Sequence, residues 1–184
     1  MKGRKIIAVL GLPGSGKSEV INFLMKKYGW PKVYFGEPTF EELERLNLPI
    51  TEKNERMARE SLRKKYGVGY YGEQAIKKIA KIKGRKNVVL ESFYTWAEYL
   101  MFKKKFKSYF IAIAIYASPK IRYARLAGRK KRPLAEKEAQ GRDYAQIENL
   151  FQGGPIAMAD YTILNEGSRG ELHEKVDSII NSIE

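Results

Sequence analysis

A short glycine-rich stretch near the start of the chain has the residue types needed to hold a phosphate group. Residues 11–18 read GLPGSGKS and fit the spacing G-x-x-x-x-G-K-S/T at every fixed position. Glycines let backbone N–H groups turn inward around an anion, and the lysine can reach phosphate oxygens. The motif therefore predicts a nucleotide-phosphate site, and we expect it to be formed by Gly11, Pro13, Gly14, Ser15, Gly16, Lys17, Ser18 and Glu19.

Two more groups suggest a metal ion and a lid around this site. The hydroxyl of Ser18 can ligate Mg²⁺, and Glu91 ends an apolar run where a neighbouring strand would present an acid to that metal. A surface or helix-capping role for Glu91 is an equal alternative. Arg125, Arg129 and Arg142 follow in the order expected of a lid that closes over a γ-phosphate, because guanidinium forks grip phosphate oxygens in pairs. The alternative for these arginines is a basic helix end that favours its own dipole.

The segments around these residues predict the elements that position them. Apolar runs predict strands over 5–10, 32–35, 87–91, 108–117 and 160–164. Helical spacing and caps predict helices over 17–28, 39–47, 51–67, 73–84 and 95–106, another from Ser118, and a last one over 168–183. The charged stretch 128–142 shows no clear core face. Since strands alternate with helices, we expect an α/β fold of three layers, with a mostly parallel five-stranded sheet and helices on both faces.

The order of the motifs resembles that of the nucleoside monophosphate kinase-like P-loop kinases. It is most similar to an archaeal adenylate-kinase-related family of predicted nucleotide kinases, and the similarity runs over nearly the whole chain. It is carried by GLPGSGKS, by FGE at 35–37, by ASPK at 117–120, by RLAGR at 125–129 and by MADYTILNE at 158–166.

The resemblance implies a single kinase domain in three parts, with ATP and Mg²⁺ as cofactors. The core would comprise 1–35, 87–127 and 154–184, a helical acceptor-binding insert about 36–86, and a short arginine-rich lid about 128–153. It also implies that Lys17 and the three lid arginines are catalytic, and that Asn165 lies near the adenine.

The sequence departs from this family where the phosphate acceptor should bind. Phe40 and Tyr94 stand where two arginines would grip the acceptor phosphate. Arg56, Arg59 and Arg63 are spaced along one face of the predicted 51–67 helix and offer substitutes, although a solvated charged face is a slightly better explanation of this stripe. We expect the acceptor site to include Glu37, Phe40, Arg59, Arg63, Phe93 and Tyr94, with a core or lid-contact role as the alternative for the aromatic residues.

These observations predict an ATP-dependent phosphotransferase that acts on a nucleotide or nucleotide-like small acceptor. The formal net charge of +14 keeps open an alternative, a nucleic-acid-associated P-loop NTPase or polynucleotide kinase. A third possibility is a relative that binds ATP without transferring phosphate, but the intact Lys17 and Ser18 argue against it.

Composition excludes some classes of site and location. The chain has no cysteine, so disulfides and Cys-ligated metals are excluded, and its one histidine, His173, leaves little room for His-based metal sites or triads. The apolar runs are too short for a signal peptide or a membrane span, so we expect a cytoplasmic protein.

Overall fold

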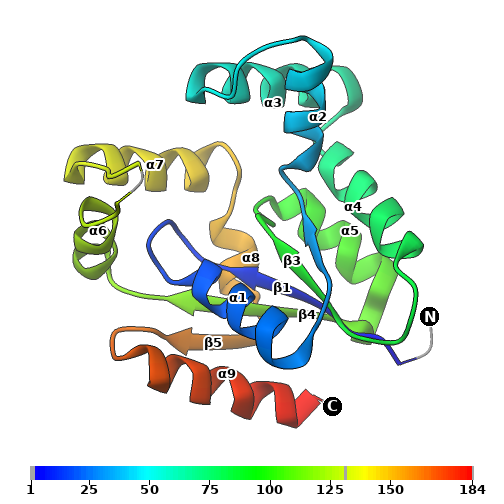
Figure 1. The fold of residues 1–184 in the computed structure, drawn as a ribbon, viewed down its shortest axis with the longest axis vertical. Coiled ribbons are helices and arrows are strands. Elements are labelled where there is room, and N and C mark those ends of the chain that lie inside the picture. Colours follow the sequence, from blue (N-terminus) through cyan, green and yellow to red (C-terminus); the bar gives the residue numbers. More distant parts are fainter. Residues whose placement is uncertain (1–2, 131, 184) are drawn as a thin grey trace.

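A parallel sheet forms the centre of the protein. The computed structural model describes residues 3–130 and 132–183, and in these residues it has five strands in the order β2-β3-β1-β4-β5 (Figure 1). The strands are β1 (Ile6–Leu10), β2 (Lys32–Tyr34), β3 (Val88–Glu91), β4 (Phe110–Tyr116) and β5 (Tyr161–Leu164). All four pairings are parallel, so the carboxyl ends of the strands share one edge. The predicted α/β fold with a five-stranded sheet is confirmed.

Helices cover both faces because successive residues of each buried strand point to opposite sides. One face, with Ile6, Ala8 and Leu10 of β1, packs against α4 (Tyr70–Lys81) and α5 (Trp96–Phe106). The other face, with Ile7 and Val9, packs against α1 (Lys17–Tyr28) and α9 (Arg169–Ile183). β1 is the central strand of the sheet, with β3 on one side and β4 on the other. The loop that follows β1 therefore lies at the middle of the carboxyl edge of the sheet.

The segment between β2 and β3 is helical, as predicted. It contains α2 (Glu37–Arg45) and α3 (Glu52–Tyr66), which stand above the carboxyl edge of the sheet in Figure 1, followed by α4. Ala75 and Ile79 of α4 join the core on the sheet, so part of the predicted 36–86 insert belongs to the core layer.

Helix caps explain one success and one error of the sequence prediction. Thr51 caps α3, since its side chain accepts a hydrogen bond from the N–H of Asn54. Thr39 was expected to open its helix in the same way, but α2 begins at Glu37 with Pro38 in its first turn. The buried Thr39 hydroxyl instead lies 2.8 Å from the hydroxyl of Tyr71.

Three helices lie between β4 and β5 in the described residues, and two of them, α7 and α8, were not predicted. After the 3₁₀ turn Lys107–Tyr109 and β4 come α6 (Pro119–Ala127), α7 (Glu136–Glu148) and α8 (Gly153–Ala157). The charged stretch around α7 gave no helical pattern because the residues it buries are Ala139 and Asp143, a small residue and an acid. None of the helices within 3–130 and 132–183 is both long and apolar enough to cross a membrane.

Candidate functional site

The loop between β1 and α1 presents backbone N–H groups at a helix N-terminus. Gly16 is the N-cap of α1, with φ 106°, and no side chain caps this helix end. The first N–H groups of a helix have no acceptor within the helix and carry a partial positive charge. They are therefore available to an anion, as the sequence motif predicts.

Four side chains hold the carbonyl groups of this loop, and three of them, Arg122, Gln152 and Asn165, come from distant parts of the chain. Gln152 donates to the oxygen of Gly11, Lys17 to Leu12, Arg122 to Pro13 and Asn165 to Ser15, at 3.2, 3.1, 3.1 and 2.7 Å. With its carbonyl groups bound in this way, the loop keeps its shape before any ligand arrives. Asn165, expected near the adenine, thus supports the loop itself.

Two glycines allow this close packing. Gly14, with φ 82°, lies against the backbone of Arg122, where a Cβ would come within 2.6 Å of the carbonyl oxygen. A Cβ on Gly16 would collide with the amide of Asn165. A side chain at either position would separate the loop from the groups that hold it, and both positive φ angles favour glycine.

The ammonium of Lys17 lies in a strongly positive environment. Burial, together with the charges of Arg129 and Arg122, lowers the pKa of Lys17 from 10.5 to about 8, with a partial offset from the charges of Asp143 and Glu91. These groups must therefore lie near Lys17, since charge effects of this kind fall with distance. A multiply charged anion would be stabilised here by several cations at once.

Arg122 and Asp143 form a buried ion pair that ties α7 to the phosphate loop. The two guanidinium Nη groups donate to the carboxylate at 2.9 and 2.6 Å, and both side chains are 4% exposed. Arg122 Nε also donates to the carbonyl of Ala117 at 3.0 Å. The sequence prediction missed Arg122, although its place three residues before Arg125 on α6 was a usable signal. It also missed Gln152, for which the sequence holds no signal.

The three predicted lid arginines lie in different settings. α6 ends at Ala127, so Arg125 lies on the helix and Arg129 lies beyond its end. The side chain of Arg129 is exposed, and its charge lowers the pKa of Lys17. Arg125 has a buried Nη1 without a hydrogen-bond partner among the described residues. Arg142 on α7 contacts Glu52 of α3, with Nη2 3.3 Å from the carboxylate.

Both predicted metal ligands belong to the surroundings of Lys17. Ser18 is exposed in the first turn of α1. Glu91 acts on the pKa of Lys17 but is ion-paired with Lys32 at 2.6 Å. The described part of the chain contains no group of three or more His, Cys, Asp or Glu residues that could hold a metal. A metal ion at this site would therefore need further oxygen ligands from a bound molecule.

The structure corrects the role expected of Glu19. Its carboxylate lies 3.0 Å from His173 Nε2 on α9, and its N–H donates to the carbonyl of Gly16. The ring of Phe23 stacks on His173 with centroids 4.1 Å apart. Both polar groups of Glu19 are thus used within the protein, which makes it a support of α1 rather than a nucleotide ligand.

Two residues expected in the acceptor site lie elsewhere. Phe93 is 0% exposed and packs against Phe35, Phe102 and Phe110, so it is a core residue and not part of a pocket. Glu37 is ion-paired with Lys78 of α4 at 2.6 Å, and both side chains are partly exposed.

The other four predicted acceptor residues come from α2, α3 and the segment after β3. The ring of Phe40 lies 6.1 Å from that of Tyr34, and the hydroxyl of Tyr94 donates to Ser92 at 3.1 Å. Arg59 and Arg63 extend from α3 toward this region, where Arg63 lies 5.3 Å above the ring of Tyr71.

Known proteins are similar to this chain in sequence and in fold. A family model described as an AAA domain matches residues 10–150. The UPF0200 proteins of Thermococcus kodakarensis and Pyrococcus abyssi are 32% and 33% identical to this chain; each comparison covers 97% of the chain, and 97% and 96% of the relative.

Solved structures with low sequence identity share the fold. TT1252 from Thermus thermophilus has a TM-score of 0.63 at 17% identity, over all of both chains. A gluconokinase from Sinorhizobium meliloti has 0.60 at 14%, over 100% of this chain and 95% of the other. A shikimate kinase from Acinetobacter baumannii in complex with shikimate has 0.58 at 20%, over 97% and 94%. With 32–33% identity over nearly its whole length, this chain belongs to the UPF0200 family, and its fold is the one seen in these kinases.

Proposed function

We propose that this protein is an ATP-dependent phosphotransferase that moves the γ-phosphate of ATP to a nucleotide or nucleotide-like small acceptor. The observation that carries the proposal is the gathering of cations at the phosphate loop. Arg122 and Arg129 both act on Lys17, and the buried Arg122–Asp143 pair fixes α7 beside them. Such fixed positive charge stabilises a phosphoryl group in transfer, because charge develops on its oxygens.

The reaction needs no covalent intermediate with the protein. An oxygen of the acceptor bonds to the γ-phosphorus while the bond from that phosphorus to the β–γ bridging oxygen breaks, and ADP leaves with the electron pair. The acceptor proton passes to solvent. We assign Lys17 and the loop N–H groups to the donor phosphates, and Arg125, Arg129 and Arg142 to the transferring group. Arg142 would have to leave Glu52 to take part.

Mg²⁺ fits this site with Ser18 and Glu91 as protein ligands. Both lie beside the loop, and Glu91 would act directly or through water once Lys32 is displaced. When bound, the ion neutralises charge on the phosphate oxygens.

Small acceptors are the partners that the fold favours. The acceptor would bind under α2 and α3, in the predicted 36–86 insert, and close under the predicted 128–153 lid. One solved structure of the same fold is a shikimate kinase in complex with shikimate, which supports a small-molecule acceptor.

An ATP-consumption screen tests the proposal. The protein is incubated with ATP·Mg and, in turn, with nucleosides, nucleoside monophosphates, deoxynucleoside monophosphates, hydroxy acids and short RNA, and ADP formation is measured. We expect one small-molecule class to raise ADP formation well above the acceptor-free rate, and the Lys17→Ala variant to abolish the increase. If no compound raises it, or if Lys17→Ala protein is as active as the wild type, the proposal is wrong.

A further inference from the structure

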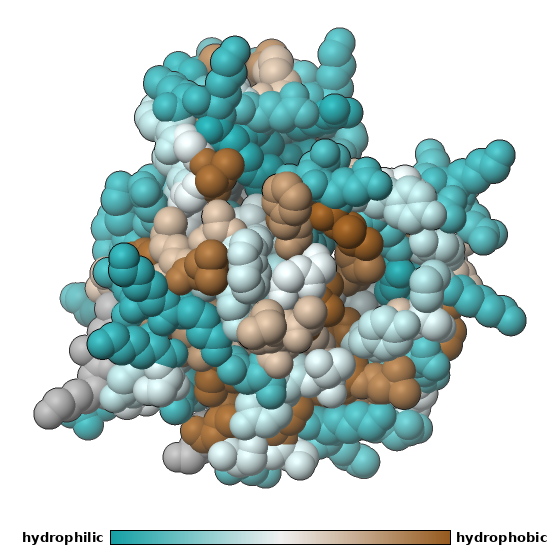
Figure 2. Space-filling view, turned by 180° about the vertical axis from the view of Figure 1, so that it is seen from behind, coloured by the Kyte–Doolittle hydropathy of each residue, from teal (hydrophilic) through white to brown (hydrophobic). Residues whose placement is uncertain are grey.

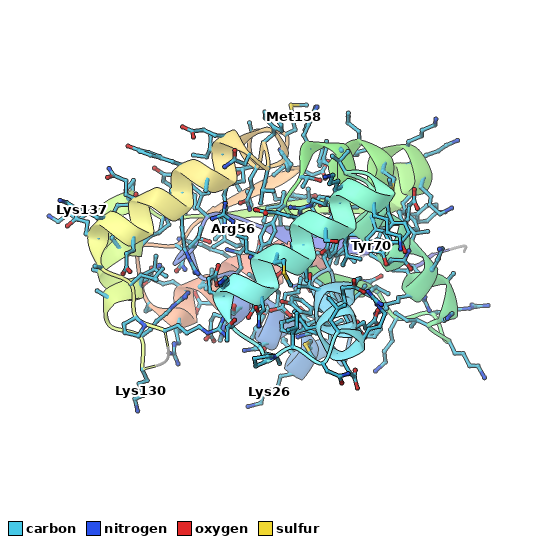
Figure 3. All side chains as sticks on the ribbon, turned by 90° about the horizontal axis from the view of Figure 1, so that it is seen from above. Lys26, Arg56, Tyr70, Lys130, Lys137 and Met158 are labelled. Atoms are coloured by element: carbon cyan, nitrogen blue, oxygen red, sulfur yellow. The ribbon has the colours of Figure 1, made fainter. Side chains whose placement is uncertain are left out.

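The space between α3 and the α6–α7 segment contains loosely paired arginines. Figure 3 shows α3 and α7 next to each other when seen from above. Glu52 and Glu55 of α3 lie 3.3 Å from Arg142 and 3.4 Å from Arg132, respectively, and Arg59 lies 3.7 and 3.5 Å from the same two carboxylates. Well-formed pairs of this kind have distances of about 2.7–2.9 Å. Three guanidinium groups thus share two carboxylates, and none of them is held tightly.

Arg63, one turn after Arg59 on α3, forms no ion pair with a carboxylate of the described residues. Its Nε is buried without a hydrogen-bond partner, and its guanidinium lies 5.3 Å above the ring of Tyr71. The Tyr71 hydroxyl is already used by Thr39. A buried donor without a partner is costly, so a ligand that accepts from Arg63 would gain from filling this position.

The charges of Arg59 and Arg63 act on residues at and just after Tyr94, one of the two positions where related kinases have an acceptor-binding arginine. Burial raises the pKa of Tyr94, and the charges of Arg59 and Arg142 act in the opposite direction. Burial likewise raises the pKa of Glu98 on α5, and the charge of Arg63 opposes this effect. Arg59 and Arg63 therefore reach from α3 toward the segment after β3 where Tyr94 replaces the arginine of related kinases.

We propose that the acceptor carries an anionic group, a phosphate or a carboxylate, and that Arg59 and Arg63 of α3 bind this group. The proposal rests on the proposed kinase function and specifies its substrate class. Arg59, Arg63, Arg132 and Arg142 outnumber Glu52 and Glu55 by two, and counting Glu98 as charged still leaves one positive charge. An anionic acceptor balances this excess, and the planar guanidinium forks match the oxygens of either group.

Arg56 belongs to the same helix but not to this site. Its side chain is 75% exposed, and its Nε donates to Glu60 at 2.8 Å (Arg56 is labelled in Figure 3). It therefore provides a matched control, an arginine of the same helix whose removal leaves the proposed site intact.

Equilibrium binding tests the inference without relying on turnover. The phosphate loop is first saturated with a non-transferable ATP analogue, and ligand-observed NMR then measures binding of matched neutral and anionic compounds. The pairs are nucleosides with their monophosphates, and polyols with the corresponding hydroxy acids. We expect the anionic members to bind, and the pair that binds distinguishes phosphate from carboxylate.

Variants connect the binding to the two arginines. We expect Arg63→Met and Arg59→Met each to weaken binding of the anionic compound roughly 10- to 100-fold, the range for a lost charged hydrogen bond. Arg56→Met should leave binding unchanged, and all three should bind the ATP analogue as the wild type does. Thermal unfolding checks that each variant is folded, and Arg63→Lys replaces Arg63→Met if the latter is not.

Three results would overturn the inference: neutral compounds that bind as tightly as anionic ones, no binding by any compound, or equal effects of Arg63→Met and Arg56→Met. A compound that binds through Arg63 and is not phosphorylated by ATP would instead reject the kinase function and leave the anion site in place.

Discussion

Lys17 in the free protein is prepared to receive negative charge. Its ammonium donates to the carbonyl of Leu12, and burial together with Arg129 and Arg122 keeps its pKa at about 8 instead of 10.5. Phosphate oxygens brought beside it would favour the charged ammonium and raise this pKa. Nucleotide binding and protonation of Lys17 are therefore coupled.

This coupling predicts a pH dependence of ATP affinity. Below pH 8 Lys17 is already charged, so affinity changes little; above pH 8 a proton must be taken up on binding, so the dissociation constant rises by up to about tenfold per pH unit. Titration calorimetry at pH 9 in buffers of different ionisation enthalpy measures this proton uptake. The Lys17→Met variant should bind ATP weakly and without uptake; uptake as large as in the wild type would contradict the assignment.

At the scale of elements, the buried ion pair between Arg122 and Asp143 anchors α7, whose buried residues are Ala139 and Asp143. Arg122 of α6 reaches Asp143 of α7 and, through the same Nη1, the carbonyl of Pro13 in the phosphate loop. Displacement of α7 would therefore disturb the loop. The element that the resemblance identifies as a lid is anchored at this point, and two of its arginines, Arg132 and Arg142, contact carboxylates of α3.

A double-mutant cycle tests this anchor. Arg122→Met leaves the Asp143 carboxylate buried without its partner, and we expect the free energy of unfolding to fall by about 3–5 kcal/mol. Combining it with Asp143→Leu should cost less than the sum of the two single changes, because no buried charge then remains. Urea denaturation measures all three variants. Additive effects would show that the pair does not act as a unit.

At the scale of the whole molecule, positive charge is spread over much of the surface. From behind, hydrophilic side chains dominate the upper part formed by α2 and α3, while apolar ones gather near the centre (Figure 2). The net charge of +14 attracts polyanions without specifying a sequence. Net charge alone therefore does not distinguish a small-molecule kinase from the polynucleotide alternative. A measurement is needed to separate them.

Salt dependence makes that distinction. We expect single-stranded RNA to bind in about 50 mM salt and to be largely released by about 200 mM, because such binding rests on counterion release. RNA should not raise ADP formation at either concentration. Fluorescence anisotropy follows the binding, and the ADP assay runs in parallel. Stimulation of ADP formation by RNA would favour the polynucleotide alternative over a small acceptor.

The sequence by itself determined the elements whose signals are local. Glycine spacing, Lys17 and Ser18 identified the phosphate loop, and apolar runs placed the strands within a few residues. These features depend on neighbouring residues and on how often apolar residues recur, so they can be predicted without knowing the fold. The predicted sheet followed from the same alternation.

Tertiary structure alone decided which distant side chains meet. Gln152 and Asn165 contact loop residues 141 and 150 positions earlier in the chain, and no local pattern indicates such contacts. Phe93 looked like a pocket residue but lies in the core, because ring packing depends on α5 and β4. α7 escaped prediction because its contact with the core is an ion pair. Arg56 is exposed while the Nε of Arg63 is buried, and this difference depends on which face of α3 packs against its neighbours.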